Sequence, residues 1–400
     1  WFINNPQPRM LHEKGTAGLV LLNNATGQLP TRNFREGVFE GAEKISGERM
    51  QQSIVRKMDG CYACPLACMP RVKVKGTYSV DPAYGGPQYE ALAMLGSNCG
   101  IDNLEALAKA HEFCNANSLD VISAGATVSY AMECFEKGIL TEKDTGGLSL
   151  KFGNADAMLR LLKMIVERQG IGDLLAEGTK RASEHIGHGS EDWALQVKGQ
   201  EVAAGEPRVD FGMGLGYAVS CTGADHGKGF AGLWYASPGP SFEKFKTLGI
   251  LEPIPLNDLS PARLRACKYL SSWRSFLDSS HMCSHLGYVY SFNQMAEMVN
   301  AVTGWNSSVF ELLNVGERAE TMARAFNARE GITRARDVLP ERFFDPLPAG
   351  PAKGSKMDRD QLNEAVLTWY KMMGWDPTTG KPLPEKLDEL DIGWVKALLR

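Results

Sequence analysis

Apolar residues recur at helical spacing through most of the chain. Leu104, Leu107 and His111 fall on one face of a helix, and Asp102 to Glu105 supplies a capping signal just before them. By the same signals we expect helices at residues 47–58, 104–114, 121–136, 155–168, 171–185, 261–277, 291–303, 309–327, 361–373 and 385–399. The pattern therefore predicts a mostly α fold.

Strand signals are few and short. Val72, Val74 and Val80 alternate with polar residues around Gly76, which predicts a small hairpin. No internal repeat, heptad run or low-complexity tract stands out in the rest of the chain. Strands are therefore expected to contribute little to the fold.

Length and turn signals suggest how the chain is divided. A chain of 400 residues can form about two or three well-filled domains. A glycine-rich stretch, Gly205 to Gly229, follows the first block of helices, so we place the boundary just before it. We expect two largely helical domains with a few short strands, residues 1–195 and 196–400. Residues 338–357 are rich in proline and glycine and predict a surface strap before the last helices.

Composition argues against several kinds of partner. Apolar residues make up 44% of the chain and charged residues 22%, as in ordinary globular proteins. The formal net charge of -4 gives no electrostatic reason to expect nucleic acid or an anionic membrane. No apolar run reaches the roughly 18 residues of a membrane helix, and no basic-then-apolar leader begins the chain. We therefore expect a cytoplasmic protein with no nucleic acid and no membrane among its partners.

Three of the nine cysteines lie close together in the sequence. Cys61, Cys64 and Cys68 have the spacing C-x-x-C-x-x-x-C, which can hold three corners of a 4Fe-4S cluster and leave the fourth to a distant residue. Cys283 is the best distant candidate. The alternatives are a zinc site or unpaired core thiols, but zinc usually takes two C-x-x-C pairs or added histidines nearby. The odd number of cysteines and their clustering fit a reducing compartment with metal or redox use.

Two other stretches, Asn115 to Asp120 and Asp278 to Cys283, are similar to each other and also bear on cofactor binding. Further specific stretches are Gly86 to Glu90, Gly96 to Ile101, and Gly214 to Tyr217 leading to His226 and Lys228. Together with the cysteine triad they resemble the tungsten-pterin aldehyde:ferredoxin oxidoreductase family, whose signature is the triad plus two copies of D-x-x-G-L-(C/D). The resemblance covers nearly the whole chain.

The resemblance implies a fold. Enzymes of this family look like three-domain proteins, with an N-terminal β domain that clamps two pyranopterins and two largely helical domains after it. We expect this chain to correspond to the two helical domains, with the β domain outside it. The first helical domain would carry the triad and the first pterin motif. The second would carry the active-site histidine, the second pterin motif and the fourth cysteine of the cluster.

The resemblance also implies cofactors and the residues that bind them. A 4Fe-4S cluster would be ligated by four thiolates, those of Cys61, Cys64, Cys68 and Cys283. A bis-pyranopterin carrying tungsten or molybdenum would be bound by polar side chains of the two motifs: Asn115 and Asp120 in the first, and Asp278, next to the ligand Cys283, in the second.

Both pterin motifs depart from the family pattern. Asn115 stands where the family has an acid. Ser118 and His281 stand where it has glycine, and Met282 follows His281 where the family has leucine. Glycine tolerates a left-handed backbone that other residues rarely adopt, so the two replacements put the shape of both turns in question.

Glu90, His226 and Lys228 match the family's residues near the metal. Adding oxygen to a carbonyl carbon while losing electrons requires a proton acceptor, which a carboxylate or imidazole can be near neutral pH. We predict Glu90 as that acceptor, and His226 with Lys228 as the groups that polarise the carbonyl or stabilise the oxyanion. Lys109 replaces a glutamate common in the family, which predicts a substrate pocket unlike that of the best-known aldehyde oxidisers.

Two other features invite a functional interpretation. Cys99 lies in a glycine-rich turn and could face the metal, as a cysteine is thought to do in the related benzoyl-coenzyme A reductases, but a small buried thiol is the simpler interpretation. The glycines at 212, 214 and 216 suggest a dinucleotide site, but they lack the preceding strand and the acidic residue that such a site needs.

The resemblance therefore implies a tungsten-dependent or molybdenum-dependent oxidoreductase. Aldehyde and water would become carboxylate, with electrons passing through the 4Fe-4S cluster to ferredoxin or an iron-sulfur partner subunit. The alternatives are a tungsten reductase similar to benzoyl-coenzyme A reductase and a non-catalytic iron-sulfur electron carrier. The metal, the particular aldehyde, the physiological acceptor and the oligomeric state stay open.

Overall fold

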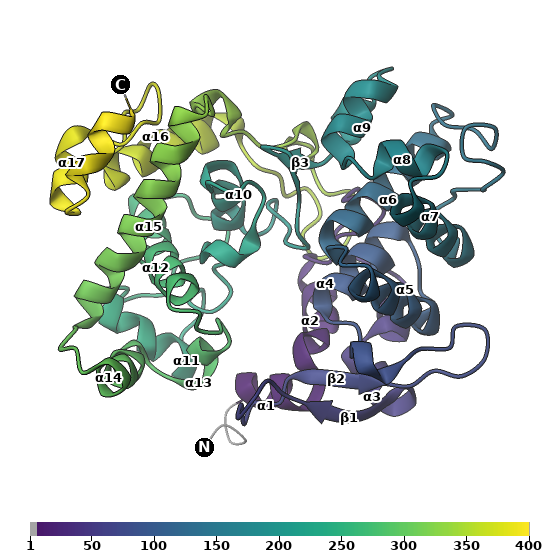
Figure 1. Ribbon diagram of the computed structural model, residues 1–400, viewed down its shortest axis with the longest axis horizontal. Helices are drawn as coiled ribbons and strands as arrows, with labels where there is room; N and C mark the ends of the chain where they lie inside the picture. Colours follow the sequence, from purple (N-terminus) through teal and green to yellow (C-terminus); the bar gives the residue numbers. More distant parts are fainter. Residues whose placement is uncertain (1–5, 400) are drawn as a thin grey trace. The chain divides into compact units, whose positions relative to one another are not determined.

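The computed structural model describes residues 6–399, which are mostly helical with two small antiparallel sheets (Figure 1). The chain divides into two compact units. The first extends to Val209 and also contains Pro340–Lys356, and the second consists of Asp210–Leu339 and the chain from Met357 onward. The expected mostly α fold with a few short strands is confirmed.

In its described residues, from Pro6 onward, the first unit combines nine α-helices with both sheets. Its helices are α1 Pro6–Lys14, α2 Leu19–Thr26, α3 Gly47–Ser53, α4 Tyr89–Ala91, α5 Leu104–Ala116, α6 Val121–Glu136, α7 Ala155–Glu167, α8 Ile171–Leu175 and α9 Thr179–Ile186. Its strands are β1 Val55–Asp59 with β2 Met69–Val72, and β3 Gln196–Val197 with β4 Gln200–Glu201. A π-helical turn, Leu92–Gly96, continues α4, and 3₁₀ turns lie at Gly15–Gly18, Ala42–Ile45, Pro82–Tyr84, Ser97–Cys99, Ser190–Trp193 and Glu341–Phe344.

The second unit has only helices and 3₁₀ turns among its described residues. Its helices are α10 Phe211–Val219, α11 Pro240–Glu243, α12 Pro261–Ser279, α13 Leu286–Val289, α14 Phe292–Thr303, α15 Val309–Arg329, α16 Arg359–Met373 and α17 Pro384–Glu389. The 3₁₀ turns are His226–Lys228, Lys244–Leu248, Arg334–Arg336 and Gly393–Leu398. The two longest helices, α12 and α15, pack side by side (Figure 1).

The units divide at residue 209, whereas the sequence pattern predicts a boundary at residue 195. The stretch between these positions packs within the first unit. Arg208 is buried there, where it forms an ion pair of 2.8 Å with Glu206 and donates a hydrogen bond of 2.6 Å to the carbonyl oxygen of Phe34. A buried ion pair tied to a distant backbone group holds this stretch to the first unit.

The Pro/Gly-rich strap also belongs to the first unit, and it is only partly on the surface. Arg342 forms ion pairs and hydrogen bonds of 2.8 Å with the buried Glu133 of α6. Phe343 is buried and packs edge-on against Phe34, with the ring centroids 5.6 Å apart. These contacts explain why a segment so late in the sequence returns to the first unit.

Most of the expected helices begin at side-chain caps. Asn103, Asp120 and Asn154 each accept a hydrogen bond from a backbone N–H in the first turn of α5, α6 and α7. Ser291 begins α14 with a full capping box. The single helix expected over residues 171–185 is wrong, because Gly178 adopts a left-handed backbone, φ 85°, and separates α8 from α9.

The strands differ from the expected hairpin. Val72 does pair, but with Val55 rather than with residues beyond Gly76, so the cysteine stretch itself connects β1 to β2. The helix predicted over residues 47–58 accordingly ends at Ser53, and β1 begins at Val55. Period-two spacing indicated a strand but not its partner, which depends on contacts outside the local window.

Each unit has its own apolar core. In the first unit the π-helical turn is buried along its whole length. In the second, aromatic side chains of α12, α14 and the 3₁₀ turn at 244–248 pack together. The rings of Trp273 and Phe292 pack edge-on, with their centroids 4.9 Å apart. Among residues 6–399, no helix has the length and apolar character needed to cross a membrane.

Candidate functional site

The cysteine triad forms the loop between β1 and β2. The backbone N–H of Cys64 donates to the carbonyl oxygen of Cys61 at 3.0 Å, and Ala63 and Ala67 adopt left-handed conformations, φ 55° and 47°. Left-handed alanines are rare, since Cβ crowds the following carbonyl, and such conformations concentrate at functional sites. Cys61 is exposed, and Cys64 and Cys68 are partly exposed.

The donor set of this loop fits an iron-sulfur cluster by its chemistry, since soft thiolates are the ligands that such clusters take. Within residues 6–399, however, no group of three or more His, Cys, Asp or Glu side chains is arranged to hold a metal ion. Cys283, exposed in the second unit, stays the predicted fourth ligand.

The second pterin motif lies at the end of α12. Asp278 accepts a hydrogen bond of 3.2 Å from Nζ of Lys228, and Nε of Arg274 lies 4.0 Å from its carboxylate. Asp225 is 3.7 Å from the same Nζ. The structure thus brings together two of the predicted site residues, Lys228 and Asp278. The side chain of Asp278 is 50% exposed, which leaves it room to accept further hydrogen bonds.

The first pterin motif lies at the end of α5 and has different partners. Asn115 donates to the carbonyl oxygen of Tyr84 at 3.2 Å, and its Nδ2 lies 3.1 Å from Nε2 of His111. Burial lowers the pKa of His111 to about 4, so the imidazole is neutral and its Nε2 can accept. Asp120 caps α6 by accepting from the N–H of Ser123 at 2.8 Å. The carboxylate predicted to hold a pterin therefore also stabilises a helix.

The two motifs share one backbone turn in spite of their missing glycines. Ser118 and His281, which stand where the family has glycine, adopt φ of 56° and 57°. In each motif the next residue donates back across the helix end, from Leu119 to the carbonyl oxygen of Cys114 at 2.9 Å and from Met282 to that of Leu277 at 2.8 Å. The left-handed turn that glycine would favour is thus formed here by serine and histidine.

Glu90 is held by the backbone of the first unit. It lies in α4, and its Oε2 accepts a hydrogen bond of 3.0 Å from the N–H of Ala204. The neighbouring Tyr89 is buried and donates to the carbonyl oxygen of the same Ala204, also at 3.0 Å. The π-helical turn that follows α4 is a form found mostly at functional sites. This arrangement fixes the orientation of a partly exposed carboxylate.

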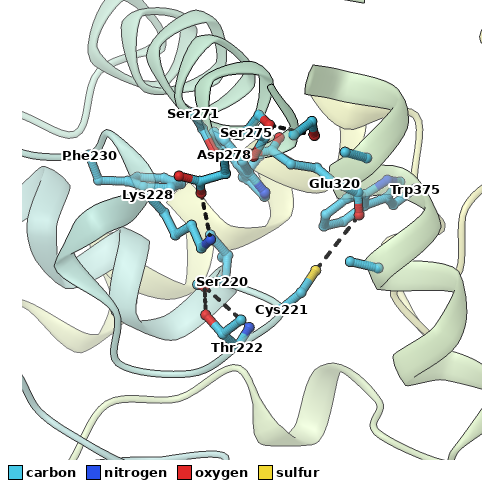
Figure 2. A pocket seen from close by; sticks show the side chains of 15 residues that line it. Ser220, Cys221, Thr222, Lys228, Phe230, Ser271, Ser275, Asp278, Glu320 and Trp375 are labelled. Atoms are coloured by element: carbon cyan, nitrogen blue, oxygen red, sulfur yellow. Dashed lines mark hydrogen bonds and ion pairs between the residues drawn. The ribbon is translucent and has the colours of Figure 1, made fainter. Parts of the chain in front are cut away.

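His226 and Lys228 share a 3₁₀ turn but face different surroundings. Asp225 accepts from the N–H of Gly227 at 2.7 Å and thereby caps the turn. His226 is exposed, whereas Lys228 lines a cavity of about 180 Å³ in the second unit (Figure 2). Of the predicted site residues, Lys228 and Asp278 line this cavity, and the other cavity walls come from α10, α12, α15 and the Trp369–Trp375 region.

Glu320 of α15 is a pocket residue that the sequence did not single out. It accepts hydrogen bonds from the hydroxyls of Ser271 and Ser275, the latter at 3.1 Å. Burial raises its pKa from 4.5 to about 7. One acid among many on a long amphipathic helix gives no signal by itself. Only the close packing of α12 on α15 reveals that this glutamate is enclosed.

Three other positions are explained by packing or pairing. Cys99 is fully buried and donates to the carbonyl oxygen of Met94 at 3.3 Å, and burial raises its pKa, so it is a packed thiol. A Cβ at Gly212 would overlap the guanidinium of Arg263, so this glycine serves close packing rather than a dinucleotide. Nζ of Lys109 forms an ion pair of 2.5 Å with Oε2 of Glu112 on the same helix, α5.

The family profile described as aldehyde ferredoxin oxidoreductase, domains 2 and 3, matches residues 1–392. The chain belongs to the aldehyde ferredoxin oxidoreductase family. The tungsten-containing aldehyde ferredoxin oxidoreductase of Thermococcus kodakarensis is 35% identical to it over 385 residues, which are 96% of this chain and 60% of that protein. The enzyme of the same name from Pyrococcus furiosus is 34% identical over 388 residues, again 96% of this chain and 60% of the relative.

Two less similar proteins have names that refer to other reactions. An aliphatic sulfonate oxidoreductase, WOR-like subunit, from Pyrococcus furiosus is 31% identical over 383 residues, covering 92% of this chain and 55% of that one. Among solved structures, the active-site complex BamBC of benzoyl coenzyme A reductase with 1,5-dienoyl-CoA has a TM-score of 0.70 at 22% identity, over 96% of this chain and 60% of its own. That similarity shows the shared fold.

The chain spans about 60% of the length of the aldehyde ferredoxin oxidoreductases that it matches. The matched part comprises both helical domains of the family, as expected from the motifs.

Proposed function

We propose that this chain is the helical part of a tungsten-dependent oxidoreductase that converts aldehydes to carboxylates. The observation that carries the proposal is the repeated left-handed turn at residues 115–120 and 278–283, a conformation that the glycines of the family's motif would favour and that serine and histidine adopt here. Membership of a family whose relatives are named tungsten-containing aldehyde ferredoxin oxidoreductases supports the same reaction.

The residues that would hold the cofactors follow from their positions. Asp278 and Asn115 would present oxygens and an amide to the pterin rings, and Asp120 would do so while capping α6. The thiolates of the triad with Cys283 would hold the 4Fe-4S cluster. When bound, the tungsten-pterin supplies the two-electron chemistry and the cluster supplies single-electron transfer to ferredoxin or an iron-sulfur partner subunit.

The side chains of this chain orient the substrate and move its protons. Glu90, held through Oε2 by Ala204, would accept a proton as water adds to the aldehyde. Lys228 is a cation in the cavity, where it would stabilise the negative charge that develops on the carbonyl oxygen. His226 would assist from the same 3₁₀ turn.

Replacing Glu90 with glutamine tests the assignment of the proton acceptor. E90Q keeps an oxygen for the Ala204 N–H but cannot accept the proton, so we expect kcat to fall by about 10²-fold or more with metal and iron content unchanged. Steady-state kinetics and elemental analysis of anaerobically purified full-length protein would measure both. Full activity in E90Q would remove Glu90 from the mechanism.

Two other functions are separated by simple measurements. A reductase acting on an aromatic thioester would turn over benzoyl-coenzyme A and not aldehydes. A non-catalytic electron carrier would contain iron but neither tungsten nor molybdenum. Either result would replace aldehyde oxidation as the function of this protein.

A further inference from the structure

Glu320 lies on α15 one turn after a close contact of this helix with α12. A Cβ at Gly316, one turn earlier in α15, would overlap the carbonyl oxygen of Ser272 in α12. Only glycine allows the two helices to approach this far. The carboxyl group of Glu320 is therefore enclosed between helices, where the Ser271 and Ser275 hydroxyls reach it.

The hydrogen bonds of Glu320 are unequal. Oε1 accepts from both serine hydroxyls, whereas Oε2 is buried with no hydrogen-bond partner. None of the ion pairs found in residues 6–399 includes this carboxylate. A buried carboxylate without a cation or a full set of donors is costly, and protonating the unpartnered oxygen removes that cost. The geometry favours a neutral acid with its proton on Oε2.

The pocket links Glu320 to the pair formed by Lys228 and Asp278. All three residues line the same cavity, and Figure 2 shows the ion pair and the serine-bound glutamate on its walls. The rest of the lining is largely apolar, with Phe230, Trp369 and others, which strengthens electrostatic effects between the charged members.

The surrounding charges act on Glu320 in opposite directions. Burial is the largest influence and raises its pKa from 4.5 to about 7; the Ser271 and Ser275 hydrogen bonds and the charge of Lys228 lower it, and Glu317 raises it. The charged groups on the elements packed around it are Lys268, Arg274 and Asp278 of α12, Glu317 and Arg324 of α15, Lys228 and Asp225 of the 3₁₀ turn, and Lys386 of α17.

We propose that Glu320 is a proton-exchanging acid of this pocket, coupled to the charge of Lys228 and working during turnover. The role of Glu320 during turnover rests on the proposed aldehyde oxidation. In that reaction aldehyde and water give carboxylate, protons and two electrons, and the electrons pass to the iron-sulfur acceptor. A deprotonated Glu320 takes up one of those protons, forming an O–H bond at Oε2. It then returns the proton to water through the pocket.

Infrared titration of the full-length holoenzyme tests the exchange without turnover. We expect one carboxyl band to titrate with a midpoint near pH 7 and to be missing in E320Q. In K228Q the midpoint should rise, because the cation that favours the carboxylate is gone. In S271A the midpoint should also rise, because the carboxylate loses a hydrogen bond. If E320Q does not fold, the shift in S271A tests the assignment of the band to Glu320 in its place. R329Q, at the exposed end of α15, should leave it unchanged.

Turnover supplies the second readout. In E320Q we expect kcat for aldehyde to fall about tenfold, to lose its pH dependence near 7, and KM to stay the same. Two results would overturn the inference: no titrating band that depends on Glu320 and Lys228, or an E320Q enzyme with the wild-type pH profile. A titrating band in a protein that oxidises no aldehyde would refute the proposed function and the turnover role, while leaving the coupling to Lys228 in place.

Discussion

The two pterin motifs have the same backbone and different chemistry. Residues 115–120 and 278–283 both end a helix, both place a non-glycine residue at φ near 57°, and both close the turn with a hydrogen bond from the following N–H. In the first motif the leading side chain is a neutral amide, next to the neutral His111. In the second it is an acid paired with Lys228.

The last residues of the two motifs differ as well. Asp120 is committed to the N-terminus of α6, whereas Cys283 is exposed and has its thiol free. The same turn is therefore built twice with different side chains at its first and last positions. One copy has a neutral contact and a helix cap, and the other has a charged contact and the cysteine that we propose as a metal ligand.

The largest effect should come from replacing Cys283, the last residue of the second motif. C283A removes the proposed fourth thiolate, so we expect at least half of the iron and nearly all activity to be lost after anaerobic purification. The measurement is iron content together with the cluster's visible absorbance. C267A, which truncates a buried packing thiol, is the matched control and should keep its iron.

Replacing Asp120, the last residue of the first motif, should affect stability rather than iron content. D120A loses a helix cap, which costs about 1 kcal/mol of stability, and should leave the iron content unchanged. If D120A lost iron as fully as C283A, or if C283A kept it, the division of labour between the two motifs would be wrong.

A smaller effect is expected at the leading positions. D278N removes the charge that faces Lys228, and we expect tungsten affinity or activity to fall about 10- to 100-fold, as for other residues that support a metal site. N115D adds a charge beside His111 instead, which should raise the pKa of that histidine from about 4 and be visible by NMR. Equal tungsten loss in an asparagine-to-alanine variant, N115A, would show that the charge at 278 has no special role.

The smallest effect should come from the turn itself. S118G and H281G remove the strain of a left-handed non-glycine residue, so each should stabilise its unit by about 0.5–1 kcal/mol. S118V should destabilise by a similar amount or more, since β-branched residues tolerate this region worst. Unfolding midpoints would measure all three. A glycine variant less stable than the wild type would mean that Ser118 or His281 has a role beyond the backbone.

Local signals predicted much of this molecule. Capping residues such as Asn103 and Ser291 placed helix starts correctly. The family resemblance singled out Lys228 and Asp278 separately, and the structure shows that they form an ion pair. Features set by distant contacts escaped prediction. The partner of Val72, the return of Arg342 to Glu133 and the enclosure of Glu320 by α12 all depend on residues far away in the sequence.

The most direct test of the account is the metal content of anaerobically purified full-length protein. We predict about four iron atoms and about one tungsten or molybdenum per chain, with the iron lost in C283A and the tungsten or molybdenum reduced in D278N. Iron without either heavier metal, or a C283A variant with its full iron, would contradict the central claim that both motifs serve a pterin site beside a 4Fe-4S cluster.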